Sequence, residues 1–101
     1  PVLSVIEVAS MEEAIEVAND TDYGLTASVF TANARKALRA ARDIRAGTVT
    51  VNCYGEGDIS TPFGGYKQSG IGRENHKMML DHYQQTKNML VSYNPNKLGF
   101  F

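Results

Sequence analysis

The residues of this sequence that could build a reactive site gather around one glycine-rich segment, TPFGGYKQSG at positions 61–70. The segment follows a strand-like stretch at 48–52 and precedes a helix-like stretch that begins at Arg73. A strand, a glycine-rich loop and a helix in this order place a shaped backbone at the edge of a sheet, where α/β enzymes build their sites. The segment is not a phosphate cradle, because no lysine follows Gly70, and positions 70–75 lack the last glycine of a dinucleotide fingerprint.

A cysteine nucleophile or a histidine metal site is the alternative chemistry. Cys53 is the single cysteine of the chain, and nothing in the sequence places a histidine beside it. A free cysteine is more often a small packed hydrophobe. His76 and His82 lie six positions apart on an expected helix, so about 600° of rotation puts them on opposite sides. We therefore expect neither catalysis by Cys53 nor a bound metal.

Composition bounds the classes of protein that this chain can belong to. The 101 residues are 43% hydrophobic and 21% charged, with a net charge of −1. Such a chain can form one small domain that buries about two-thirds of its unfolded surface. The charge attracts neither nucleic acid nor an anionic membrane, and no apolar run approaches the roughly 20 residues of a membrane span. A single cysteine excludes an internal disulfide and fits a reducing compartment, so we predict a cytoplasmic location.

The first half of the chain predicts alternating strands and helices. Positions 2–8 are mostly apolar and predict a buried strand. Ser10 and Glu13 form a capping box that starts a helix, which ends near Asn19. Positions 25–31 predict a second strand.

A second helix is predicted over 34–46. The apolar side chains that would form its buried face are Ala34, Ala37, Leu38, Ala41 and Ile44. Asn33 can cap its start, and Gly47 stands where a C-terminal cap glycine belongs. The arginines of this helix could suggest a nucleic-acid partner, but such side chains are usually solvated, and we expect no such partner. A third strand at 48–52 completes two βαβ units, which favours a parallel sheet with right-handed crossovers.

The second half predicts a loop at 53–72, a helix at 73–83 and a strand at 86–92. Loops as long as this one are usually functional or held by neighbouring segments. Gly64 and Gly65 are most simply interpreted as permissive turn positions, and Lys67 as a surface or interface lysine. The last strand would leave an apolar edge, which invites another chain.

Several segments resemble the C-terminal part of the NAD(P)-dependent aldehyde dehydrogenases. They are DYGLTASVFT at 22–31, AGTVTVNCY at 46–54 and PFGGYKQSGIGRE at 62–74. The resemblance implies an α/β fold, with 1–83 as part of a three-layer, parallel-sheet catalytic domain. It further implies that 84–101 form an oligomerisation strand and tail, so that a homo-oligomer assembles through 86–92.

The resemblance also implies a reaction. In the family, a cysteine thiolate attacks the aldehyde, hydride passes to NAD(P)+, and a glutamate assists hydrolysis of the thioester. The segments of the family that carry these groups lie upstream of the part that this sequence resembles. We therefore expect no catalytic, cofactor-binding or metal-binding residue in this chain, and NAD or NADP only in the complete enzyme.

The resemblance places four residues at the aldehyde tunnel: Phe63, Tyr54, Gly57 and Asp58. Phe63 would line the tunnel, and the loop from Cys53 to Asp58 would form one side of its mouth. Glu56 and Asp58 could attract the cationic end of an aminoaldehyde, although loop acids are more often simply solvated. The ending from DHYQQTK onward looks most like acetaldehyde and short-chain enzymes, whereas GEGD at 55–58 looks like aminoaldehyde enzymes.

Two functions follow from these observations. The chain is expected to be the C-terminal part of an aldehyde dehydrogenase, inactive alone. The alternative is a free-standing remnant that acts as an oligomerisation or interaction module through its last strand.

Overall fold

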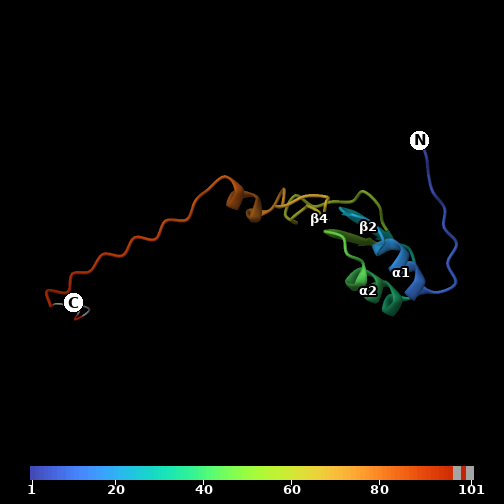
Figure 1. The fold of residues 1–101 in the computed structure, drawn as a ribbon, viewed down its shortest axis with the longest axis horizontal. Helices are drawn as coiled ribbons and strands as arrows, with labels where there is room; N and C mark the ends of the chain where they lie inside the picture. Colours follow the sequence, from blue (N-terminus) through green and yellow to red (C-terminus); the bar gives the residue numbers. More distant parts are fainter. Residues whose placement is uncertain (97–98, 100–101) are drawn as a thin grey trace.

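The computed structural model describes residues 1–96 and 99. In chain order its elements are α1 (Met11–Asn19), β1 (Tyr23–Gly24), β2 (Thr26–Val29), α2 (Ala34–Asp43), β3 (Thr48–Val51), β4 (Tyr66–Lys67) and the 3-10 helix η1 (Lys77–His82). The molecule is elongated, 73 × 28 × 27 Å. Figure 1 shows the helices and strands clustered near the N-terminal end, with an extended arm that follows η1.

One βαβ unit forms the centre of this cluster. β2 and β3 pair in parallel, with Thr26 opposite Thr48 and Val29 opposite Val51, and α2 is the connection between them. β1 and β4 form a separate antiparallel pair, Tyr23 with Lys67 and Gly24 with Tyr66. The predicted α/β class is therefore confirmed, with the second and third predicted strands in parallel register.

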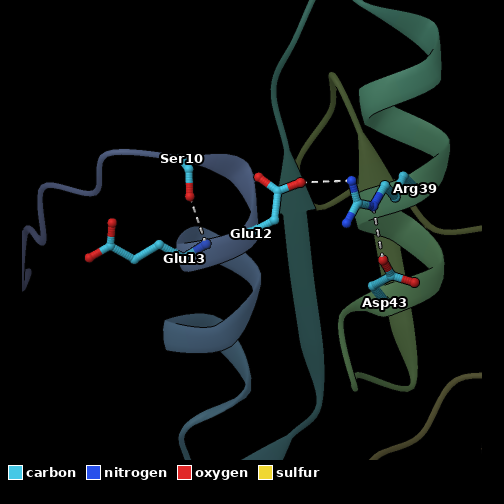
Figure 2. Close-up of polar contacts among 5 residues, drawn as sticks. All are labelled: Ser10, Glu12, Glu13, Arg39 and Asp43. Carbon is cyan, nitrogen blue, oxygen red and sulfur yellow. Dashed lines mark hydrogen bonds and ion pairs between the residues drawn. The ribbon is translucent and has the colours of Figure 1, made fainter.

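The start of α1 follows its local sequence signal. The Ser10 hydroxyl accepts the backbone N–H of Glu13 at 3.1 Å (Figure 2). The Glu13 carboxylate accepts the N–H of Ala9 at 2.8 Å. The Ser10 bond satisfies a backbone donor that the first turn of a helix leaves unpaired. The predicted start of the helix at Ser10 is confirmed, while the Glu13 carboxylate bonds to Ala9 rather than to the N–H of Ser10 that a capping box would use.

The start of α2 was predicted correctly, but its end was not. The Asn33 side chain accepts the N–H of Lys36 at 3.0 Å and caps the helix. The helix stops at Asp43, because the Asn19 side chain accepts the N–H of Arg45 at 2.7 Å and donates to the Asp43 carbonyl at 2.9 Å. Gly47 is therefore not the C-terminal cap, and the predicted extension to position 46 is wrong.

An ionic link joins the two helices, which lie side by side. The Arg39 guanidinium contacts the Glu12 carboxylate at 2.7 Å and the Asp43 carboxylate at 3.5 Å (Figure 2). The backbone N–H groups at the start of α1 and the Arg39 side chain lower the pKa of Glu12. At least one arginine of the basic helix therefore serves an intramolecular contact.

Burial is shallow. Among the described residues, the buried apolar side chains are Ala37 and Ala40, each 5% exposed, while the predicted core residue Leu38 is 60% exposed. The buried face of α2 is thus turned away from Leu38 and includes Ala40, which the predicted buried face omitted. The chain exposes 9200 Å², against about 5,700 Å² expected for a compact monomer of this mass.

Two predicted strands are absent from the described residues. Positions 2–8 and 86–92 are extended but have no strand partner. A strand leaves its backbone polar groups unpaired without a neighbour, so apolar, β-branched sequence alone does not form one. The prediction of two βαβ units is therefore wrong, and the described residues do not show the predicted three-layer sheet.

The predicted helix over 73–83 is also shorter than expected. Asn75 and His76 have φ values of 56° and 53°, in the left-handed region, which interrupts a right-handed helix. The backbone of Glu74 pairs instead with Phe63. Only Lys77–His82 is helical, as a 3-10 segment. No helix among residues 1–96 is long and apolar enough to pass through a lipid bilayer.

Candidate functional site

The glycine-rich loop lies against the start of β3 through direct backbone contact. A Cβ atom built on Gly47 would lie 1.6 Å from the Gly64 carbonyl oxygen, and one on Gly24 would lie 2.4 Å from the Arg45 carbonyl oxygen. The N–H of Gly47 donates to the Gly24 carbonyl at 3.0 Å. Neither Gly64 nor Gly65 has a positive φ. A Cβ atom on Gly64 would lie 2.4 Å from the Gly72 carbonyl oxygen, and one on Gly65 would lie 2.4 Å from the Ser69 Cβ. Close approach, and not a left-handed turn, therefore explains these two glycines.

The far end of the loop is held by Arg73. Its guanidinium donates to the carbonyls of Gly65 at 3.0 Å and Gly72 at 2.7 Å, and it lies 5.5 Å from the centre of the Tyr66 ring. The N–H of Arg73 donates to the His82 ring at 3.2 Å. This network fixes the loop to η1 and leaves Phe63 at the border between two cavities.

A cavity of about 290 Å³ opens beside the β2–β3 pair. Its lining comes from both strands, from the loop after β3 and from the glycine-rich loop: Thr26, Ala27, Ser28, Thr48, Thr50, Tyr54, Gly55, Glu56, Gly57 and Phe63. Three of the four residues that we assigned to a tunnel from sequence, Phe63, Tyr54 and Gly57, thus lie around one space. Glu56 joins them, while Asp58 does not.

The wall and mouth of this cavity differ in rigidity. Phe63 is 38% exposed, and its backbone exchanges two hydrogen bonds with Glu74, at 2.9 and 2.6 Å. Tyr54 is 84% exposed, and a Cβ atom on Gly57 would meet nothing within 4 Å. Phe63 is therefore a fixed wall, whereas the 54–57 segment has open space around it.

Asp58 is engaged by its own turn. Its carboxylate accepts the N–H of Ser60 at 2.8 Å, and its carbonyl accepts the Thr61 N–H at 2.9 Å and the Thr61 hydroxyl at 2.7 Å. The backbone N–H and the side chain of Ser60 lower the pKa of Asp58. These bonds identify Asp58 as a residue that shapes the loop.

The polar interior of the β2–β3 pair borders the same cavity. The hydroxyls of Ser28 and Thr50 lie 2.9 Å apart across the paired strands. The Thr50 hydroxyl also donates to the Cys53 carbonyl at 2.8 Å. This bond holds the end of β3 where the chain turns towards Tyr54.

The hydrogen bonds give no support to a nucleophile or a metal at this site. His82 accepts the N–H of Arg73, and His76 accepts the N–H of Met78 at 3.4 Å. Neither histidine is hydrogen-bonded to Cys53 in the part of the chain that the structure describes. Within that part, no group of three or more histidine, cysteine or acidic side chains could hold a metal ion.

Sequence reasoning missed two polar residues that hold this site. Asn19 joins the ends of α1 and α2, and the Lys67 ammonium donates to the carbonyls of Asn19 and Thr21. Both contacts join segments that are distant along the chain. The only sequence signal for the Lys67 contact is that the last turn of α1 has no basic residue of its own.

Comparison with known proteins places this loop and cavity in a family. The model of the aldehyde dehydrogenase family matches residues 1–89. The chain belongs to the aldehyde dehydrogenase family. Acetaldehyde dehydrogenase 2 of Cupriavidus necator is 61% identical over all 101 residues, which cover 20% of that protein. The chain therefore spans about a fifth of the length of such relatives.

Solved aldehyde dehydrogenase structures contain the same arrangement. The NAD+ complex of an aldehyde dehydrogenase from Bacillus cereus is 45% identical, with a TM-score of 0.89, and the match covers 93% of this chain and 19% of that one. The NAD+ complex of betaine aldehyde dehydrogenase from Staphylococcus aureus is 41% identical, with a TM-score of 0.86 and the same coverage. At these identities the likeness extends beyond the fold to the family.

Proposed function

We propose that this chain is the C-terminal part of an NAD(P)-dependent aldehyde dehydrogenase, which oxidises an aldehyde to a carboxylic acid. The observation that carries the proposal is the match of the family model to residues 1–89. Solved relatives that bind NAD+ support a nicotinamide cofactor in the complete enzyme. The chain corresponds to about a fifth of such enzymes, so we propose that it is inactive by itself.

The contribution of this chain is then the shape of the substrate tunnel. Phe63 forms a wall that is fixed by its backbone pairing with Glu74, while Tyr54 and Gly57 form the more open mouth. Asp58 holds the loop that presents them. When bound in the complete enzyme, the nicotinamide cofactor accepts the hydride of the aldehyde. We propose that the nucleophile and the base of the reaction lie in other parts of the enzyme.

The mouth of the cavity favours a substrate with a cationic end. Glu56 lies at its edge, and its carboxylate has no hydrogen bond within the described residues. Gly57 next to it leaves room for a polar group. The aldehydes for which the relatives are named differ, acetaldehyde for one and betaine aldehyde, a cation, for another. We infer that Glu56, and not Asp58, draws a cationic aldehyde to the mouth.

The decisive experiment is the intact mass of the protein isolated from its source, followed by an assay. We expect a mass several times the 11.1 kDa of this chain, and reduction of NAD+ or NADP+ when an aldehyde is added. A protein near 11.1 kDa that reduces neither cofactor with any aldehyde would refute the proposal.

The second candidate is an interaction module, and exposed apolar side chains favour it. The arm after η1 is extended (Figure 1). In this part of the chain Met89, Leu90 and Tyr93 are 81%, 92% and 93% exposed. Exposed apolar surface of this kind marks contacts with other chains. In either case we propose that a homo-oligomer forms through 86–92. A monomeric mass by light scattering at tens of micromolar would contradict it. The cytoplasmic location stays a prediction.

A further inference from the structure

The side chain of Lys67 ties the glycine-rich loop to the end of α1. Its ammonium donates hydrogen bonds to the carbonyl oxygens of Asn19 and Thr21, each at 2.8 Å. Asn19 is the last residue of α1. One side chain thus connects two segments that are 48 and 46 positions apart.

The end of α1 needs a cation from elsewhere in the molecule. The last carbonyls of a helix have no partner within the helix, and they form the negative end of its dipole. α1 has acidic residues in its first turn, Glu12 and Glu13, but no basic residue in its last turn. Lys67 supplies the missing charge, so its ammonium has an electrostatic as well as a hydrogen-bonding reason to remain there.

The backbone at position 67 shows that the side chain is what is required. Lys67 has a φ of 53°, in the left-handed region that glycine adopts freely and other residues adopt at a cost. A glycine would fit this backbone better. A lysine in such a conformation is therefore explained by its side-chain contacts and not by the turn.

The residues around Lys67 and the residue Phe63 are close in sequence, and both are held by hydrogen bonds to other segments. Beside Lys67, the N–H of Gln68 donates to the Asp22 carbonyl at 2.9 Å, and the N–H of Gly24 donates to the Ser69 hydroxyl at 2.9 Å. Four residues before Lys67, Phe63 is paired with Glu74. The loop is thus held at one end by Lys67 and its neighbours and at the other end by the Phe63 pairing.

We propose that Lys67 is a positioning residue, which sets the place of Phe63 in the cavity wall by holding the glycine-rich loop on the end of α1. The proposal rests on the tunnel function proposed above for Phe63. Loss of the ammonium loosens one end of the loop, although the backbone contacts of Gln68 and Ser69 remain, so the wall shifts and an aldehyde binds less well. The groups that react with the aldehyde are proposed above to lie in other parts of the enzyme, so the expected effect is on binding rather than on the chemical step.

The test compares three substitutions in the complete enzyme. Lys67→Met keeps the strained backbone and the aliphatic stem without the charge. Lys67→Gly relieves the backbone and also removes the tie, whereas Lys67→Arg keeps a cationic donor. Lys77→Met, at an exposed lysine of η1, removes the same charge as a control.

Two readouts are needed, amide hydrogen exchange of residues 61–72 and the steady-state constants for an aldehyde. We expect Lys67→Met and Lys67→Gly to speed exchange in this peptide by roughly tenfold or more, because both remove the two charge-assisted hydrogen bonds of the ammonium. We expect both to raise KM by about fivefold with kcat changed less than about twofold, as for loss of binding without loss of chemistry. Lys67→Arg should keep the exchange rate and KM close to those of the unsubstituted enzyme, because it retains a cationic donor. Lys77→Met should change neither quantity.

The outcomes separate this proposal from the function on which it rests. Unchanged exchange in Lys67→Met, which keeps the backbone conformation, would show that the ammonium does not hold the loop, and faster exchange with an unaltered KM would show that the tie does not place the wall. Either result overturns the proposal. If the unsubstituted enzyme oxidises no aldehyde, the proposed function fails, while the exchange data still decide whether Lys67 holds the loop.

Discussion

Gly47→Ala tests the backbone contact that seats the glycine-rich loop. The new Cβ atom would lie 1.6 Å from the Gly64 carbonyl oxygen, whereas ordinary contact begins at 3.4 Å. The two backbones must therefore separate by up to 1.8 Å, the difference of these distances. No flexible side chain can move aside to make this room. Overpacking of this kind costs about 1–3 kcal/mol and occasionally more, and we expect about 3 kcal/mol or more here.

The matched control is Gly57→Ala, which adds the same methyl group where nothing lies within 4 Å. Because Gly57 has no positive φ, alanine should fit, with a stability change of about 0.5 kcal/mol or less. Thermal unfolding of both variants in the complete enzyme measures the contrast, and the aldehyde KM reports on Phe63 next to the contact. Equal midpoints for the two variants would refute the reasoning that Gly47 and Gly64 must touch.

Three further outcomes are expected. Ser10→Ala should lower stability by about 1 kcal/mol, because it removes the N-cap of α1; denaturant or thermal unfolding measures this loss. Contacts in the folded state lower the pKa of Glu12, so its contribution to stability is complete above the unfolded pKa near 4.5 and is lost as pH falls through the lower, folded value. Arg39→Gln should weaken this acid dependence, which stability measured against pH would detect, and a profile identical to wild type would contradict it. Glu56→Gln in the complete enzyme should raise KM for aminoaldehydes but not for acetaldehyde. Equal effects on both substrates would show that the Glu56 carboxylate does not attract the cationic end of an aminoaldehyde.

The parts of the fold that the sequence predicted correctly depend on near neighbours. Ser10 and Glu13 lie three positions apart, as do Asn33 and Lys36, so both helix starts could be recognised from spacing alone. The parallel pairing of β2 with β3 also needed only a helix between two β-branched runs. Positions 2–8 and 86–92 have the same kind of apolar sequence but no partner strand, and a strand depends on its partner.

The candidate site was predicted in part, for a related reason. Tyr54, Gly57 and Phe63 surround one cavity because they flank the same loop that returns to β3. Asp58 does not line this cavity, and its carboxylate accepts the N–H of Ser60 two residues on, a local turn contact typical of aspartate; its assignment to the tunnel stays a prediction. The Lys67 contact was missed because it joins residues 48 positions apart, a separation at which no periodicity or spacing rule applies.

Close backbone contacts explain why glycine stands at several positions of this site. The site is assembled by main chain against main chain, at Gly47 with Gly64 and at Gly24 with the Arg45 carbonyl, rather than by an apolar core. Such contacts leave no side chain that could adjust to a larger residue, so one methyl group moves the loop. Ile71, which lies within the segment 62–74, has a fully exposed side chain and should accept polar substitutes. We therefore expect the effect of an added methyl group to follow backbone proximity, large at Gly47 and small at Gly57, and we propose that this loop shapes the space where an aldehyde binds without supplying a catalytic group.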